Sequence, residues 1–123
     1  MITITLPYLP PPEFSRNSRE FWATLNRVRD RTSDDVKALL LEAGWQPSQP
    51  MSRAQIMVEF VLPNRKRRDH DNLITAMKPC WDALVQHQVI KDDCLSCIGI
   101  PTYRYRYSRH KEALTIIRIE EGA

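Results

Sequence analysis

Two aspartates separated by a single residue, Asp69 and Asp71, are the first candidates for chemistry in the sequence. In an extended chain, residues two apart point to the same side, so the two carboxylates would converge. Carboxylates that are held close together repel each other unless a proton or a cation lies between them. Mg²⁺ is the usual cation, held by a few carboxylates together with water and a substrate phosphate. The pair therefore indicates a Mg²⁺ site, although a lone Asp-x-Asp is more often a surface feature or a helix cap.

The residues that follow this pair have the periodicity of a helix over 71–88, and Asp71 is placed to be its N-cap. At about 100° per residue, Asp71, Lys78 and Asp82 lie within roughly 40° of one another, which predicts a polar stripe. Thr75 shares that face. Pro79 costs about 3 kcal/mol inside a helix, so we expect a bend at Lys78 or a new start at Pro79. The opposite face carries the residues expected in the core: Leu73, Met77, Trp81 and Leu84.

A second acidic pair, Asp92 and Asp93, follows the predicted helix. A helix over 72–86 would be about 22 Å long, so this pair starts far from Asp69 and Asp71. It reaches them only if the chain turns back along the helix or if a partner chain supplies the proximity. Both possibilities are compatible with the sequence.

Four consecutive cations precede the first pair: Arg65, Lys66, Arg67 and Arg68. On its own, such a run is usually a solvated turn. Beside an acidic motif it can instead hold the DNA backbone, which is the sequence-independent and salt-dependent part of DNA binding. His70 would point away from the two aspartates in an extended chain. We therefore interpret it as a solvent or phosphate contact rather than as a general base.

A metal ion, a lysine and a run of cations together match the needs of phosphodiester cleavage. The metal polarises the phosphodiester and lowers the pKa of a bound water, and the lysine neutralises developing charge. The stretches "RRDHDNL", "MKPCWDAL" and "VIKDD", which cover residues 64–93, closely resemble the RusA family of Holliday-junction resolvases of bacteria and phages. Members carry an Asp-x-Asp-Asn-Leu motif, a lysine four residues before Asp-Ala-Leu or Asp-Gly-Leu, and a later Asp-Asp pair.

This resemblance implies a role for each matching residue. Asp69, Asp71 and Asp93 would be catalytic carboxylates that bind the metal, and Lys78 would be the catalytic lysine. The supporting residues would be Asp92, Asp82 and Asn72. In the best-known members the lysine lies nearer to the second aspartate, where Thr75 stands here; about one extra helical turn returns Lys78 to the same face. The resemblance also implies Mg²⁺ as the cofactor, with Mn²⁺ as a substitute, and a homodimer acting on a four-way junction.

The stretch "YRYRYSRHK" alternates tyrosines with arginines. On a strand, Tyr103, Tyr105 and Tyr107 share one face, while Arg104 and Arg106 share the other. The tyrosines could pack on the core with the arginines in solvent. Alternatively, the arginines could contact phosphates, or the tyrosines could stack on unpaired bases near a crossover. We include both arginines among the candidate DNA-binding residues.

The remaining pattern predicts one domain over residues 1–123, of the α/β (α+β) class, with the RusA-like order β-α-α-β-α-β-β. Strands are expected over 1–8, 54–62 and 112–120, and a strand-like segment over 94–108. One helix is expected from about Asn17, with Phe21, Leu25 and Val28 on one face. A second is expected over 32–45, with Ser33 as its cap and Gly44 as its stop. Helices packed on a mixed sheet follow from this order.

Composition limits the class of protein. The chain has 123 residues, of which 42% are hydrophobic and 27% are charged, so we expect a globular domain. No apolar run approaches the ~20 residues of a membrane-spanning helix, and the N-terminus does not resemble a signal peptide. Three cysteines without an export signal indicate reduced thiols in the cytoplasm. Buried structural thiols are a better interpretation of Cys80, Cys94 and Cys97 than zinc ligands, even with His87 as a fourth.

The residues predict a Mg²⁺-dependent nuclease. The resemblance implies, more narrowly, a structure-selective endonuclease that resolves Holliday junctions by paired symmetric nicks in DNA recombination and repair. Two rivals remain. In the first, the protein is a non-catalytic DNA-binding module whose acids are caps and ion-pair partners. In the second, it is a metal-dependent nuclease for other branched nucleic acids or for RNA.

Overall fold

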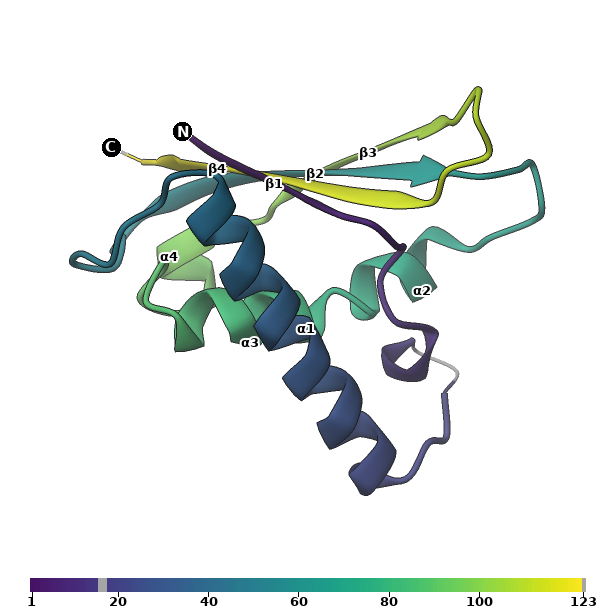
Figure 1. The fold of residues 1–123 in the computed structure, drawn as a ribbon, viewed down its shortest axis with the longest axis horizontal. Helices are drawn as coiled ribbons and strands as arrows, with labels where there is room; N and C mark the ends of the chain where they lie inside the picture. The colour runs from purple at the N-terminus through teal and green to yellow at the C-terminus, as the bar shows by residue number, and fades with distance from the viewer. Residues whose placement is uncertain (16–17, 123) are drawn as a thin grey trace.

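A computed structural model describes residues 1–15 and 18–122 of the chain. Four strands form one sheet, and the helices lie together on one side of it (Figure 1). The strands are β1 (Ile2–Leu6), β2 (Ala54–Leu62), β3 (Thr102–Tyr107) and β4 (Leu114–Glu121). The helices are α1 (Trp22–Glu42), α2 (His70–Thr75), α3 (Lys78–Gln86) and α4 (Leu95–Ile98), with a 3-10 turn, η1 (Pro12–Phe14), before α1. The predicted α+β class and mixed sheet are confirmed.

The sheet has the order β1-β4-β2-β3. β4 is antiparallel to both of its neighbours, whereas β2 and β3 are parallel and form one edge pair. Alternate residues of each inner strand face the helices, as the sequence pattern predicted. The buried set on this face includes Ile4, Leu6, Ile56, Val58, Phe60, Ile117 and Ile119.

One long helix, α1, replaces the two helices predicted over 17–45. Asn17, the predicted start, lies outside the described residues, and the helix begins at Trp22. Ser33 is not a cap, because its hydroxyl donates to the Gln86 side chain at 2.9 Å inside the α1–α3 interface. Gly44 does end the helix, since its positive φ of 83° allows Trp45 N–H to donate to Leu40 O at 2.9 Å.

The helix predicted over 71–88 is in fact two helices. α2 ends at Thr75 and α3 begins at Lys78, so the break falls at Ala76 and Met77. Pro79 occupies the first turn of α3, where a missing N–H costs no helical hydrogen bond. The predicted core residues Met77, Trp81 and Leu84 are buried, and Leu73 is half-buried.

The strand-like segment predicted over 94–108 is only partly a strand. Its first part is the single helical turn α4, in which Cys97 and Ile98 N–H both donate to Cys94 O at 3.0 Å. Ile98 is buried, and Gly99, with a φ of 59°, turns the chain into β3. In the part of the chain that the structure describes, no helix is both long and apolar enough to cross a membrane.

Candidate functional site

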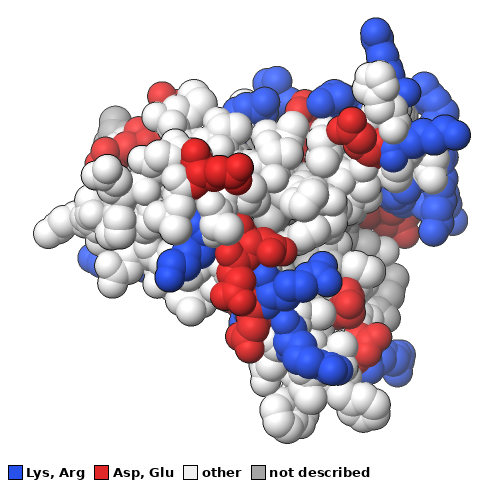
Figure 2. Space-filling model, viewed as in Figure 1, with Lys and Arg blue, Asp and Glu red and all other residues white. Residues whose placement is uncertain are grey.

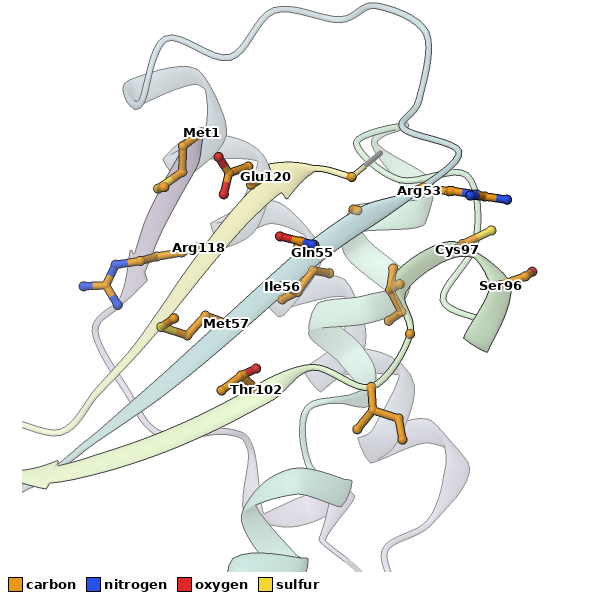
Figure 3. A pocket seen from close by; sticks show the side chains of 15 residues that line it. Met1, Arg53, Gln55, Ile56, Met57, Ser96, Cys97, Thr102, Arg118 and Glu120 are labelled. Atoms are coloured by element: carbon orange, nitrogen blue, oxygen red, sulfur yellow. The ribbon is translucent and has the colours of Figure 1, made fainter.

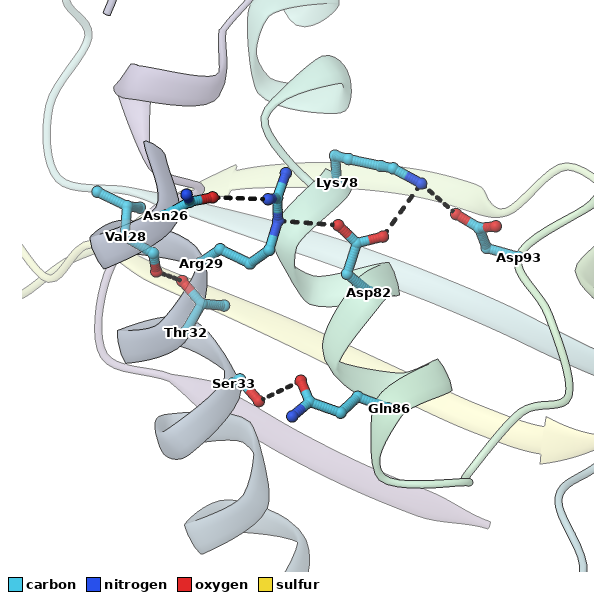
Figure 4. A network of polar contacts seen from close by, with 9 residues as sticks. All are labelled: Asn26, Val28, Arg29, Thr32, Ser33, Lys78, Asp82, Gln86 and Asp93. Carbon is cyan, nitrogen blue, oxygen red and sulfur yellow. Dashed lines mark hydrogen bonds and ion pairs between the residues drawn. The ribbon is translucent and has the colours of Figure 1, made fainter. Parts of the chain in front are cut away.

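The second acidic pair lies beside the first turn of α3, within the same chain. After α3, Val89 and Ile90 are buried, and an isolated β-bridge joins Ile90 to Met51. At this bridge, Met51 N–H donates to Val89 O at 3.0 Å, which fixes the direction of the chain after the helix. The return brings Asp93 Oδ2 to 2.9 Å from Lys78 Nζ (Figure 4). The chain therefore turns back along the helix, which was one of the two possibilities left by the sequence.

Lys78 is the centre of a chain of ion pairs that joins α1, α3 and the 91–93 turn. Its ammonium also lies 3.1 Å from Asp82 Oδ1. Only this part of the predicted polar stripe is present on one helix, because Asp71 and Thr75 belong to the separate helix α2. Asp82 Oδ2 in turn lies 3.3 Å from Arg29 Nε on α1 (Figure 4). Arg29 Nε is covered from solvent and makes no well-directed hydrogen bond, so its contact with Asp82 is chiefly an attraction of charges. Arg29 was missed as a site residue because it is remote from Asp82 in sequence.

The electrostatics of this cluster keep both partners of the central pair ionised. The hydrogen bond to Asp93, followed by that to Asp82, raises the pKa of Lys78 above its ordinary value. The same bond from Lys78 lowers the pKa of Asp93. Asp92 supports this arrangement, because its Oδ1 accepts the Asp93 N–H at 2.8 Å. At neutral pH, Lys78 is thus a fixed positive charge rather than a base.

The first acidic pair lies at the start of α2. Asp69 is extended and is the N-cap residue, whose carbonyl accepts the Asn72 N–H at 3.2 Å; Asp71 lies in the first turn and is not the cap. His70 already belongs to the helix, so the expected two-residue alternation fails there. Its Nε2 lies 3.0 Å from Asp71 Oδ1 instead of pointing away. Arg67 lies 3.6 Å from Asp69 Oδ1.

The acids do not form a ready-made metal centre. Among residues 1–15 and 18–122, no three His, Cys, Asp or Glu side chains lie close enough together to hold a metal ion. Asp71 and Lys78 lie on different helices, α2 and α3. The donor type nevertheless suits Mg²⁺, which commonly takes one or two carboxylates and completes its shell with water and substrate phosphate. The carboxylates of Asp69, Asp71 and Asp93 fit this donor chemistry.

The cationic run forms an organised loop rather than a loose turn. The Arg68 guanidinium donates to Asn64 O at 3.0 Å and to Lys66 O at 3.2 Å, so it holds the loop together from inside. Arg65 lies over the Tyr107 ring, 4.3 Å from its centroid. Lys66 and Arg67 are exposed. Figure 2 shows Lys and Arg side chains gathered at this end of the molecule, where β2 runs into the loop.

Strand β3 brings its own aromatic and cationic residues to the same end. Tyr103 is half-buried and stacks on Phe60 at 6.1 Å, whereas Tyr105 and Tyr107 are exposed. Arg104 and Arg106 lie on the opposite face, and Arg106 is 3.5 Å from Glu59. A groove of about 450 Å³ separates β3 from the loop and α2; its polar lining is Lys66, Arg68, His70 and Arg104, with all three tyrosines. Tyr103 thus packs inward, while Tyr105 and Tyr107 face solvent. Stacking of tyrosines on unpaired bases stays a prediction.

The cysteines differ from the buried thiols that we expected. Only Cys80 is fully buried, and burial raises its pKa to about 12. Cys94 is exposed and Cys97 is partly exposed, with their sulfurs 3.5 Å apart. His87, considered as a zinc ligand, instead has its Nε2 3.0 Å from the Ser33 hydroxyl.

No protein-family model matches this sequence. A protein of Xylella fastidiosa (strain Temecula1 / ATCC 700964), described only as uncharacterized, is 26% identical over 106 residues. The match covers 76% of this chain and 69% of that protein. The description of that protein gives no activity, so the function of this chain must be inferred from its residues and their arrangement.

Proposed function

We propose that the protein is a Mg²⁺-dependent endodeoxyribonuclease of the RusA type, which resolves four-way DNA junctions by paired symmetric nicks. The observation that carries this proposal is the return of Asp93 to Lys78 at the start of α3. A structural turn does not require a second acidic pair to meet a lysine on the helix that follows an Asp-x-Asp-Asn-Leu motif. A cleavage site does require carboxylates, a fixed cation and phosphate-binding groups near one another.

The side chains have separate roles in this proposal. The oxygens that would hold Mg²⁺ are those of Asp69, Asp71 and Asp93, one or two carboxylates at a time, with water and substrate phosphate completing the shell. Asp92 and Asn72 would support them. When bound, Mg²⁺ polarises the scissile phosphate and lowers the pKa of water. Lys78, whose pKa is raised by Asp93 and Asp82, stays protonated and neutralises charge that develops on the phosphate.

The cationic end of the molecule binds the DNA backbone in this account. Arg65, Lys66 and Arg67 project from a loop that Arg68 holds in shape. Arg104 and Arg106 add further cations on the other face of β3, and part of the charge of Arg106 is offset by Glu59. Phosphate contacts of this kind give affinity without sequence preference.

We further propose that the active form is a cytoplasmic homodimer. A four-way junction needs two symmetric nicks, and a two-fold dimer presents two equivalent sites. Near-simultaneous nicking then yields two duplexes that can be ligated. Recombination and repair of bacterial or phage DNA are the processes that this activity serves.

One observation favours the first rival, a DNA-binding module without catalysis. Each acid of the proposed metal set lies near a nitrogen-bearing side chain: Asp69 near Arg67, Asp71 near His70, and Asp93 near Lys78. Carboxylates in such pairs also serve as caps and loop anchors. The two interpretations differ in whether phosphodiester bonds are broken.

A comparison of substrates separates the proposal from both rivals. Synthetic four-way junction, fork, linear duplex and RNA are incubated with the protein and Mg²⁺, and in parallel with a chelator. We expect paired nicks in the junction only, and none with the chelator. Absence of cleavage on every substrate supports the binding module, while equal cleavage of forks or RNA supports a broader nuclease.

A further inference from the structure

Cys94, the N-cap residue of α4, and Cys97, within its single turn, are neighbours on one side of that turn. Their sulfurs are 3.5 Å apart, and Cys94 Sγ lies 3.1 Å from the Ser96 hydroxyl. Residues three apart in a helical turn are neighbours, which explains why the two thiols meet. A disulfide has a sulfur–sulfur distance of about 2.05 Å, so closure needs the sulfurs to approach by only about 1.5 Å.

The two thiols differ in exposure. Cys94 is exposed, whereas Cys97 is only partly exposed and packs against the core. Cys97 also lines an open cavity of about 760 Å³, on the side where Arg53 and Ser96 lie (Figure 3). Cys94 is thus suited to react first and Cys97 to react second.

This pair is joined directly to the proposed site. Cys94 follows Asp93, whose carboxylate is 2.9 Å from Lys78 and whose N–H donates to Asp92. Cys94 is one peptide bond from Asp93, so a backbone shift of about 1 Å at Cys94 on closure would be carried to Asp93. Such a shift is enough to weaken a hydrogen bond of this length.

We propose that Cys94 and Cys97 form a redox-active dithiol, which closes to a reversible disulfide by reaction with a low-molecular-weight disulfide and thereby shifts Asp93 relative to Lys78. The dithiol is independent of the function proposed above. Only its consequence for DNA cleavage rests on that function. Transient cytosolic disulfides of this kind are typically catalytic or redox-sensing.

The reaction balances without a metal or another oxidant. The Cys94 thiolate attacks one sulfur of the small disulfide, breaks its S–S bond and releases one thiolate. Cys97 then loses its proton and attacks Cys94 Sγ, which forms the Cys94–Cys97 bond and releases the second thiolate. The protein loses two electrons and two protons, and the small disulfide gains both.

The first test measures closure itself. Reduced protein is equilibrated with mixtures of reduced and oxidised glutathione, alkylated, and mapped by mass spectrometry. We expect a bond between Cys94 and Cys97, with buried Cys80 unmodified. The Cys97→Ser variant should trap glutathione on Cys94, and Cys94→Ser should react about tenfold more slowly. Mixed disulfides without closure, or equal rates for the two variants, would overturn the proposal.

The second test measures the link to Asp93. In ¹H–¹⁵N spectra, the Asp93 amide should move when the disulfide closes and return on reduction, and should stay still in a Cys94→Ser/Cys97→Ser variant. Closure with an unchanged Asp93 amide refutes the link. If the amide moves but neither form cleaves a junction, the nuclease proposal fails while the dithiol is upheld.

Discussion

Replacing Asp82 by Asn tests whether the ion-pair chain holds the candidate site together. Asp82 lies between Lys78 at 3.1 Å and Arg29 at 3.3 Å, and its side chain is 30% exposed. The substitution keeps the size of the side chain and removes its charge. Arg29 Nε, which is covered from solvent, then loses its counter-charge.

The expected cost follows from these ion pairs. A partly exposed ion pair contributes about 0–1 kcal/mol. Because Asp82→Asn removes two such pairs at once, those with Arg29 and Lys78, we expect a cost of about 1–2 kcal/mol. For a chain of this size that corresponds to a fall in Tm of roughly 4–8 °C. Lys78→Met should cost less, about 0.5–1 kcal/mol, because Lys78 is 52% exposed.

The assay is urea unfolding followed by tryptophan fluorescence, since Trp81, immediately before Asp82, is buried and reports on α3. Asp34→Asn, at an exposed acid of α1, is the matched control and should leave the unfolding free energy unchanged. The Arg29→Met/Asp82→Asn double variant should be less destabilised than the sum of its single variants. The reasoning would be refuted if the unfolding free energy of Asp82→Asn equalled that of Asp34→Asn. It would also be refuted if Asp82→Asn were more stable than Lys78→Met.

Three further predictions concern pH, salt and backbone strain. Unfolding of wild type and Asp93→Asn is compared at a series of pH values. The stability that Asp93 contributes should be complete above the ordinary aspartate pKa of 3.8. It should disappear as the pH falls through the lowered pKa of Asp93 in the folded protein. The contribution of Lys78 should persist below 10.5 and be lost as pH rises through its raised value. Lys66→Ala and Arg67→Ala should each weaken binding to all DNA sequences alike and reduce the salt slope of affinity by about 1, measured by fluorescence anisotropy; an unchanged slope would contradict phosphate contact. Gly99→Ala should lower the unfolding free energy by about 1–3 kcal/mol, because a non-glycine residue is strained at a φ of 59°. A clash does not contribute, since an added Cβ would meet nothing within 4 Å.

The sheet could be predicted because its signals are local. Strands β2 and β4 each bury one face, so the alternation of apolar and polar residues in the sequence shows which side chains face the core. The helix stop at Gly44 is equally local, since a positive φ favours glycine. These features depend on neighbours in the chain and need no knowledge of the rest of the fold.

The errors arose where a distant partner decided the structure. Ser33 is of a type that commonly caps helices, but its hydroxyl is satisfied by Gln86 across the α1–α3 interface, so the helix continues through it. Arg29 carries no local signal for its pairing with Asp82. The single turn of α4 is too short to show a helical period, and its cysteines were therefore placed in a strand.

The sequence could name the candidate site residues but not their geometry, and their roles stay a prediction. It left open whether the chain turns back along the helix, and the structure resolves this by placing Asp93 2.9 Å from Lys78. The path that does this depends on buried Val89 and Ile90 and on their bridge to Met51, which no local pattern indicated.

The most direct test of the central claim is cleavage of a synthetic four-way junction in Mg²⁺ by the Asp71→Asn variant, with junction binding measured in the same preparation. Wild-type protein and the Asp34→Asn control should produce paired symmetric nicks. Asp71→Asn should bind the junction as tightly as wild type and fail to cut it, because a carboxylate that holds the metal is lost. Undiminished cleavage by Asp71→Asn would contradict the assignment of these acids as a metal-dependent nuclease site.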